Sequence, residues 1–476
     1  MLFNTLDYAL FLPLIFLLYW KVFKGKQKAQ NGLLLLGSYF FYACWDWRFM
    51  FLLLFSTLID YFSAQKIQKS QNHKKLWMWI SITLNIGFLV FFKYYNFFAD
   101  SFLELFLKMG VQLNPTSLNI ILPVGISFYT FHGVSYVLDV YHGKIKAENN
   151  IFQYALFVSF FPLLVAGPIE RATHLLPQIK EVRNFNYLQA VDGLKQILWG
   201  LVKKVIIADN CAMYVNEIFE NYTSLSGSTL LIGAVLFAFQ IYGDFSGYSD
   251  IAIGSAKLFG IKLLKNFNYP YFSRDIAEFW RRWHISLSTW FRDYLYIPLG
   301  GSRVAPRKAI RNTFIIFLIS GFWHGANWTF IAWGALNALY FLPILLTKNN
   351  RNHLDVVASN QFLPSFKESL QMLSTFLLVT LGWVFFRSDS IFDSFLYLKK
   401  IFSPSLFSLP SVDFGIIFIL ITLFMLVEWV GRKGNYAIEN LGQAWHKVFR
   451  YSLYYSLILS LFYFAGKEEQ FIYFQF

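Results

Sequence analysis

Two histidines stand in apolar surroundings, where an ionisable side chain is costly. His324 is the only titratable group in residues 314–331, and glycines flank it at positions 321 and 325. An ionisable residue at membrane depth is a functional hypothesis by default. Burial keeps an imidazole neutral at pH 7 and able to accept a proton. The sequence therefore predicts that His324 is a general base in a dry site. The alternative is a packed histidine bonded to a nearby carbonyl group.

The second histidine, His284, lies in a segment rich in tryptophan and arginine. At 100° per residue, the aromatic and leucine side chains of residues 280–295 share one helix face, opposite Arg281, Arg282 and Arg292. This pattern is typical of an amphipathic helix at a membrane interface. His284 falls within the apolar arc, where such a helix gains nothing from it, so we expect it to face a protein interior or cavity. The alternative is a histidine that snorkels at the boundary.

Tryptophan is concentrated around the two histidines. Six of the 15 tryptophans fall in residues 280–333. An aromatic belt at the lipid headgroups explains most of them. The alternative is the wall of a pocket for an acyl or pantetheine-like tail.

Two carboxylates interrupt another apolar segment. Residues 241–251 contain Asp244 and Asp250 together with two serines and two glycines, which predicts a broken helix that lines a cavity. The carboxylates could cap the loop or pair with Arg281 or Arg282. In a secondary transporter they would form an ion or substrate site. Residues 122–129 and 166–170 are further proline and glycine breaks.

Composition places the chain in the membrane. It is 56% hydrophobic and 14% charged, with a mean hydropathy of +0.45, more apolar surface than a soluble interior of 476 residues can bury. We therefore expect an all-α polytopic integral membrane protein, with several short, tilted or re-entrant helices. Candidate spans, at about 20 residues each, are 8–20, 33–43, 49–61, 76–98, 120–140, 152–166, 230–242, 314–346, 376–386, 414–430 and 453–464.

Lysine-rich loops orient the chain. Residues 21–28 and 66–75 carry four lysines each, so both loops are expected in the cytoplasm and the N-terminus outside. No cleavable signal is expected. The net charge of +14 is scattered between spans, which disfavours nucleic-acid binding. The two cysteines, Cys44 and Cys211, support neither a disulfide framework nor a metal cluster, and no metal site is predicted.

Several motifs together resemble the membrane-bound O-acyltransferase (MBOAT) family. They are Asp244–Asp250, Glu278–Gly301 and Phe322–Ala326, supported by residues 122–128, 165–169 and 471–476. The resemblance runs nearly end to end, so we expect one membrane domain over 1–476. Its parts are N-terminal helices over 1–110, a catalytic core over 118–346 and C-terminal helices over 367–476. His132 departs from the family pattern, in which a glutamine is expected, and has no family role.

The resemblance implies a fold and an activity. The fold is a ring of about 11 tilted, broken and re-entrant helices around a central tunnel. The activity is O-acyl transfer, of an acetyl group above all, from a cytoplasmic thioester, acetyl-CoA or an acyl carrier, towards an extracytoplasmic polysaccharide such as alginate. No tightly bound cofactor is expected. A separate extracytoplasmic SGNH-type acetyltransferase would complete the transfer. The implied location is the bacterial inner membrane.

The resemblance also implies site residues. His324 matches the essential histidine of the family and His284 the second one. Asn327, three residues after His324, would share a helix face with it and could orient the ring or polarise a carbonyl group. Asp244, Asp250 and Arg281 are possible supporting residues. An alternative within the same family is D-alanyl transfer to teichoic acid.

Overall fold

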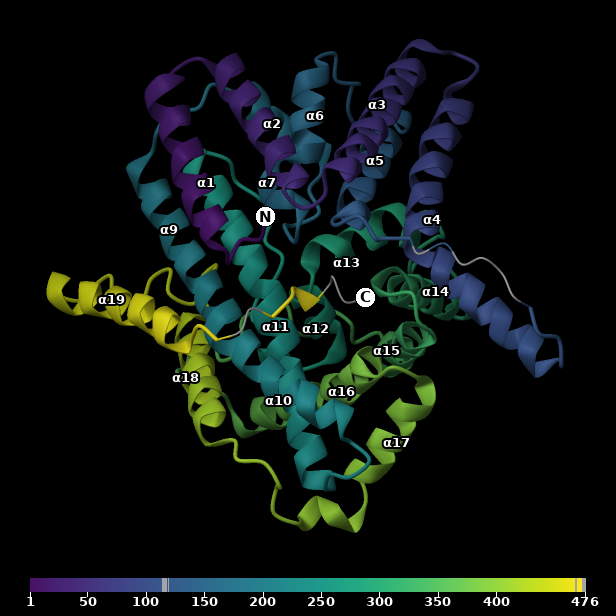
Figure 1. Ribbon diagram of the computed structural model, residues 1–476, viewed down its shortest axis with the longest axis vertical. Coiled ribbons are helices and arrows are strands. Elements are labelled where there is room, and N and C mark those ends of the chain that lie inside the picture. The colour runs from purple at the N-terminus through teal and green to yellow at the C-terminus, as the bar shows by residue number, and fades with distance from the viewer. Residues whose placement is uncertain (114–117, 119, 467–468, 473–476) are drawn as a thin grey trace. The chain divides into compact units, whose positions relative to one another are not determined.

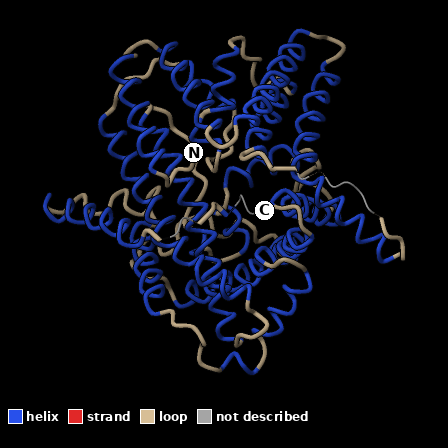
Figure 2. The backbone as a smooth tube through the Cα atoms, viewed as in Figure 1, coloured by secondary structure: helices blue, strands red, loops and turns tan. Residues whose placement is uncertain are grey.

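The chain folds into helices joined by loops. The computed structural model describes residues 1–113, 118, 120–466 and 469–472, and no strand occurs among them (Figures 1 and 2). The described residues form two compact units, Met1–Ala190 with Ser255–Leu264, and Val191–Gly254 with Lys265–Phe476. Most of the terminal motif 471–476 lies outside the described residues, and the predicted single domain over 1–476 stays a prediction.

Within the described residues, five helices are long and apolar enough to cross a membrane. They are α3 (Trp47–Lys69), α4 (Lys74–Lys108), α11 (Gly227–Leu258), α15 (Trp328–Leu346) and α16 (Phe366–Arg387). Each overlaps a span predicted from hydropathy. The predicted class, an all-helical membrane protein, is confirmed at this level.

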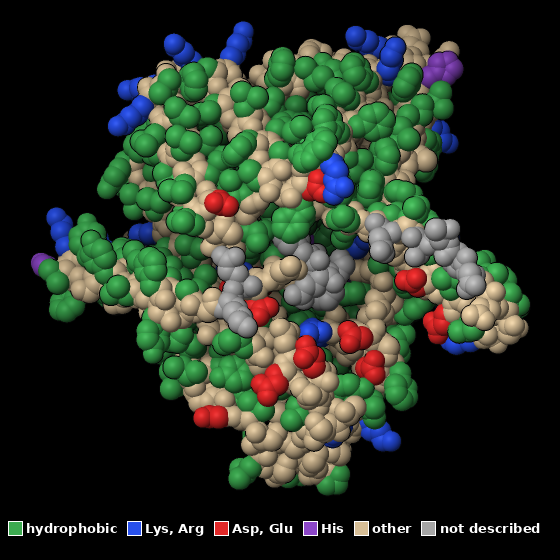
Figure 3. Space-filling model, in the orientation of Figure 1, with side chains coloured by type: hydrophobic (Ala, Val, Ile, Leu, Met, Phe, Trp, Pro, Cys, Tyr) green, Lys and Arg blue, Asp and Glu red, His purple; other side chains and the backbone are tan. Residues whose placement is uncertain are grey.

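The first unit contains the N-terminal helices. They are α1 (Leu6–Leu17), the π-helix η1 (Leu18–Val22), α2 (Gln27–Ala43), α3, α4, α5 (Ile126–Tyr141), α6 (Ile151–Ser159), α7 (Phe161–Leu164) and α8 (Ala172–Lys180). The predicted pair, 33–43 and 49–61, is present as α2 and α3, but both helices are longer than predicted, and α3, with 23 residues, is not a short piece. The lysine-rich loops before α2 and between α3 and α4 lie at the same edge of this unit, where Lys and Arg side chains gather (Figures 1 and 3).

Two loops of the first unit follow the predicted breaks. Gly125 has φ +73° and precedes α5, and a Cβ there would collide with the carbonyl oxygen of Leu164, so only glycine fits. The loop around 165–171 separates α7 from α8. His132 on α5 is fully buried, and its Nε2 accepts the backbone N–H of Glu170 at 3.0 Å. Its observed contact is therefore structural: it fixes the second loop.

The second unit carries both histidine motifs. Its helices are the C-terminal part of α9 (Tyr187–Leu201), the π-helix η2 (Val202–Ala208), α10 (Asp209–Glu220), most of α11, the 3₁₀ turn η3 (Pro270–Phe272), α12 (Ile276–Arg282), α13 (Ile285–Phe291), the π-helix η4 (Arg292–Tyr296), α14 (Pro306–His324), α15, α16, α17 (Ile391–Ile401), the 3₁₀ turn η5 (Pro404–Phe407), α18 (Gly415–Gly431) and α19 (Lys447–Phe464).

The break predicted at 241–251 is wrong, because α11 runs unbroken through it. Its glycines serve helix packing instead. A Cβ on Gly247 would lie 2.7 Å from the carbonyl oxygen of Gly200, and one on Gly254 would lie 2.5 Å from that of Gly193. Small residues let two helix backbones approach closely, as in membrane helix pairs generally. The glycines therefore bring α9 and η2 against α11.

The single amphipathic helix predicted over 280–295 is also wrong. The chain breaks at Trp283 and His284, between α12 and α13, and His284 adopts the left-handed conformation with φ +43° and ψ +54°. A non-glycine residue in this region costs of order 1–3 kcal/mol and is enriched at functional sites. The helical periodicity of hydrophobic residues continues on both sides of the break, so the sequence pattern does not reveal the turn.

Candidate functional site

His324 ends helix α14 inside a cage of aromatic rings. Its exposed fraction is 2%, and its ring centroid lies 4.8 Å from Trp323, 5.1 Å from Trp333 and 5.4 Å from Phe386. Three large apolar rings surround the imidazole and shield it from water. A neutral imidazole in a dry cage is the form that a general base requires.

The glycines beside His324 allow its hairpin to close. A Cβ on Gly321 would collide with the carbonyl oxygen of Phe330, and one on Gly325 with the ring of Phe330. The two glycines thus let α14 and α15 pack backbone against backbone around the turn at 325–327. The close packing of α14 against α15 therefore fixes the position of His324 at the end of this hairpin.

His284 is the second buried histidine of the site. It is 1% exposed, and its Nδ1 lies 3.0 Å from Oδ1 of Asn266. Phe245 on α11 packs edge-on against its ring at 4.6 Å. The prediction that His284 faces the protein interior is confirmed, although the backbone around it is a turn and not the helix from which we argued.

Trp323 contacts both histidines. Its ring centroid lies 5.9 Å from His284 and 4.8 Å from His324. Two motifs 40 positions apart in the chain therefore share one aromatic contact. Sequence reasoning singled out both histidines but missed Asn266, since an asparagine in an irregular segment carries no signal of its own.

Asn327 does not share a helix face with His324. Helix α14 ends at His324, Gly325 is extended, and Asn327 is the N-cap of α15, where its Oδ1 accepts the N–H of Thr329 at 3.0 Å. Its Nδ2 donates to the carbonyl oxygen of Asp389 at 2.8 Å. The helical argument for Asn327 therefore fails, and its observed contacts fix the turn that follows His324.

Asp244 and Asp250 are ion-paired, with lysines and not with the predicted arginines. Lys203 lies 2.5 Å from Asp250, and Lys204 lies 2.8 Å from Asp244. Asp244 also accepts the backbone N–H of Ile472 at 2.6 Å. Both lysines come from η2, a wide helical turn of the kind found at functional sites. The sequence signal that could have found them is a pair of consecutive lysines inside an apolar helix.

Arg281 lies in a separate polar group. Its guanidinium donates to the carbonyl oxygens of Asn350 and His353 at 2.6 and 2.7 Å, so it secures the loop after α15. Arg274 in the same region donates to Asp355 at 2.8 Å, and this hydrogen bond lowers the pKa of the Asp355 carboxyl group. The expected pairing of Arg281 with Asp244 or Asp250 is therefore wrong.

A large, mostly apolar pocket borders α14 one turn before His324. Its empty space, with the open solvent at its mouth included, is about 1020 Å³. Apolar side chains dominate its wall, and Arg292 and Arg351 add positive charge. Its lining residues are Trp280, Leu287, Ser288, Phe291, Arg292, Tyr296, Ser302, Thr313, Ile316, Phe317, Ser320, Phe341, Asn350 and Arg351. Of the site tryptophans, Trp280 lines this pocket, whereas Trp333 and Trp383 stack on each other at 5.6 Å.

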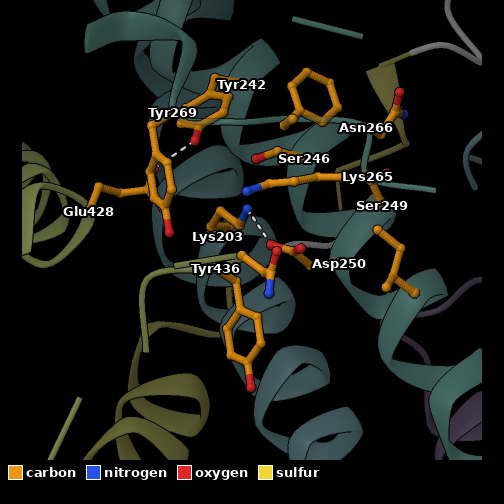
Figure 4. A pocket seen from close by; sticks show the side chains of 13 residues that line it. Lys203, Tyr242, Ser246, Ser249, Asp250, Lys265, Asn266, Tyr269, Glu428 and Tyr436 are labelled. Carbon is orange, nitrogen blue, oxygen red and sulfur yellow. Dashed lines mark hydrogen bonds and ion pairs between the residues drawn. The ribbon is translucent and has the colours of Figure 1, made fainter. Parts of the chain in front are cut away.

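A smaller polar pocket of about 300 Å³ lies behind Asn266 (Figure 4). Lys203, Asp250, Lys265 and Glu428 line it, with the hydroxyl groups of neighbouring serines and tyrosines. Glu428 on α18 accepts hydrogen bonds from Tyr242 at 2.6 Å and Trp199 at 3.1 Å. Among the described residues, no group of three or more histidine, cysteine or acidic side chains could hold a metal ion.

Comparisons with known proteins identify the family of this chain. Residues 146–367, which include both histidine motifs, match the model of the MBOAT, membrane-bound O-acyltransferase, family. The chain is 40% identical over 410 residues to the probable alginate O-acetylase of Pseudomonas aeruginosa, covering 85% of this chain and 75% of that relative. It is 40% identical over 433 residues to the peptidoglycan O-acetyltransferase of Helicobacter pylori, covering 84% and 79%.

A more distant relative is the teichoic acid D-alanyltransferase of Streptococcus thermophilus, 31% identical over 261 residues, or 51% of this chain and 62% of the relative. The chain belongs to the membrane-bound O-acyltransferase family, as the motifs predict. It is an O-acyltransferase of the membrane, and the predicted type of enzyme is confirmed.

Proposed function

We propose that this protein moves an acetyl group from a cytoplasmic thioester across the membrane to an acceptor hydroxyl group, for O-acetylation of an extracytoplasmic polysaccharide, with His324 as the general base. The observation that carries the proposal is the buried imidazole of His324, enclosed by aromatic rings, within the segment that matches the membrane-bound O-acyltransferase family. The 40% identity to both an alginate and a peptidoglycan O-acetyltransferase supports acetyl as the acyl group and a glycan as the acceptor.

The reaction needs one base. His324 takes the proton of the acceptor hydroxyl group as its oxygen attacks the thioester carbonyl carbon. The tetrahedral intermediate then collapses, the carbon–sulfur bond breaks, and the imidazolium returns the proton to the leaving thiolate. The products are an acetyl ester and a free thiol, and no other reactant is consumed.

Charge supports donor entry at the ends of α14 and α15 away from their turn. Residues 303–311 before and within α14, and residues 348–351 after α15, are rich in lysine and arginine. By the positive-inside rule these ends face the cytoplasm, where basic groups can meet the phosphates of acetyl-CoA or an acyl carrier. The apolar pocket lies between these ends and His324, so its wall suits a pantetheine-like tail. The donor is thus a substrate, and we expect no tightly bound cofactor.

The finer features of the predicted architecture belong to the same proposal. They are a ring of about 11 helices around a tunnel, residence in the bacterial inner membrane and an N-terminus outside. The shared edge of the two lysine-rich loops supports one cytoplasmic side for both (Figure 1). We propose alginate as the polysaccharide and an SGNH-type acetyltransferase as the extracytoplasmic partner that completes the transfer.

Expression of this chain in a strain that lacks its own polysaccharide O-acetylase tests the proposal. We expect ester-linked acetate on the exported polysaccharide, measured by alkaline release, only when the wild-type chain and the partner are present. No ester above the level of an empty vector, with the protein inserted in the membrane, would refute it. D-alanine esters on teichoic acid would instead indicate the D-alanyl alternative, whose relatives match only about half of this chain.

A secondary transporter is disfavoured by the ion pairs of the second unit. An ion-coupling carboxylate has to bind and release its ion. Lys203 and Lys204 already neutralise Asp250 and Asp244 at 2.5 and 2.8 Å, in buried surroundings. These carboxylates therefore hold helices together and are not open for a transported ion.

A further inference from the structure

Among the residues that the structure describes, only Asn266 makes a hydrogen bond to the His284 ring. It is fully buried, and its Oδ1 lies 3.0 Å from Nδ1 of His284, 2.9 Å from Oγ of Ser286 and 3.4 Å from the backbone nitrogen of Ser286. Three groups therefore converge on a single atom of this amide.

The third of these contacts identifies that atom as an oxygen. A backbone N–H can only donate, so the atom that it approaches must be an acceptor, and the amide nitrogen is not one. The Nδ1 of His284 must then carry the hydrogen that it shares with Asn266. A neutral imidazole has one N–H, so its Nε2 keeps a lone pair. This Nε2 is buried without a partner among the described residues.

Backbone hydrogen bonds also fix the position of the segment that contains Asn266. The carbonyl oxygen of Asn266 accepts the N–H of Ile285 at 2.8 Å, and the N–H of Asn268 donates to the carbonyl oxygen of Arg282 at 2.9 Å. These two bonds tie segment 266–268 to the turn between α12 and α13, on either side of His284. The unusual φ of +43° at His284 is held between them.

Asn266 also lines the polar pocket shown in Figure 4, together with Ser246 and Ser249. The amide nitrogen of Asn266 and the hydroxyl groups of Ser246 and Ser249 have no hydrogen-bond partner among the described residues, although all three residues are buried. The recorded hydrogen bonds of the Asn266 side chain therefore go only to His284 and Ser286, through its oxygen.

We infer that Asn266 is a positioning residue for His284, which sets the imidazole tautomer so that the Nε2 lone pair faces the reaction site as a proton acceptor. The inference rests on the proposed function and adds to it a supporting role for His284, whose ring contacts Trp323 as that of His324 does. It predicts that chemistry at position 266 changes how activity depends on pH, which a purely structural asparagine would not do.

The test compares two substitutions in the full-length protein in detergent, from pH 6 to 9. Acetyl-CoA is the donor, and the purified SGNH-type partner with unacetylated alginate supplies the acceptor hydroxyl groups. The readout is release of the thiol as the acetyl ester forms. Asn266→Ala should lower kcat by about 10–100-fold, the range for losing a group that orients a functional histidine. Asn266→Asp keeps the accepting oxygen but adds a negative charge that favours the imidazolium form. It should therefore retain activity at high pH and move the acidic limb of the profile upward by about one pH unit or more.

Asn268→Ala is the matched control. Asn268 lies in the same segment, and its side chain accepts from Lys265 at 2.9 Å and bonds no group of His284. It should keep the wild-type pH profile. A wild-type rate and profile in both Asn266 variants would overturn the inference, and so would a loss in Asn266→Asp that is the same at every pH.

A measurement on the wild-type protein covers the case in which a variant does not fold. Nitrogen-15 NMR of histidine-labelled protein, assigned with His284→Gln, should show protonated Nδ1 and unprotonated Nε2 for His284. The opposite tautomer or an imidazolium would overturn the inference. This readout does not depend on activity, so it separates failure of the inference from failure of the proposed function, which absence of thiol release by the wild-type protein would indicate.

Discussion

Replacing His324 separates a catalytic base from a structural histidine. In His324→Ala the base is gone, and general-base catalysis contributes typically about 10²–10⁴-fold. That factor corresponds to about 2.7–5.4 kcal/mol of transition-state stabilisation. We expect glycan acetylation to fall by this factor, to near the detection limit.

The fold should survive this substitution. Removing the imidazole leaves a cavity of roughly 60 Å³, which at about 24 cal/mol per Å³ costs about 1.5 kcal/mol. The same change removes a polar group from the cage of Trp323, Trp333 and Phe386, which offsets part of that cost. Expression and the thermal midpoint in detergent should therefore change little.

His324→Gln supplies the matched comparison. Glutamine has a similar size and can hydrogen-bond, but it cannot accept a proton at neutral pH. We expect it to be as inactive as His324→Ala. The assays are ester-linked acetate on the polysaccharide in cells, at matched protein level, and thiol release from acetyl-CoA by the purified protein. Full acetylation by His324→Gln would refute the catalytic assignment and leave a structural histidine.

Three further predictions concern the rest of the site and the topology. His284→Leu should reduce acetylation while the protein remains folded and inserted. Wild-type activity of this variant would show that His284 serves packing only. Cysteines introduced in residues 21–28 or 66–75 should resist an impermeant thiol reagent in intact cells, because the proposed topology places these loops in the cytoplasm; labelling there would contradict that topology. Lys203→Met should destabilise the protein by about 3–5 kcal/mol by leaving Asp250 buried and unpaired, and adding Asp250→Asn should recover most of the thermal midpoint. Equal midpoints for the single and double variants would show that the unpaired Asp250 carboxylate is not what destabilises Lys203→Met.

The amino-acid sequence determined the class of protein and its two histidines. Composition alone requires lipid in place of a soluble interior, because apolar surface on this scale cannot be buried otherwise. Burying a lone histidine in an apolar segment costs free energy in any fold. The sequence alone therefore identifies His324 as a candidate functional residue. The lysine-rich loops likewise report orientation through local charge, which does not depend on tertiary contacts.

Only the tertiary structure decided how the polar residues pair. Glycines in α11 look like helix breakers in a sequence, yet here they permit close packing of α9 and η2, which delivers Lys203 and Lys204 to the carboxylates. The same ambiguity hid the turn at His284, since hydrophobic periodicity continues on both sides of it.

Asn266 shows most clearly what a sequence pattern cannot predict, because its hydrogen-bond partner, His284, lies 18 positions away along the chain. Periodicity and propensity report interactions between near neighbours in sequence. A hydrogen bond between two loop residues depends on how the backbone folds back, and no local pattern encodes that.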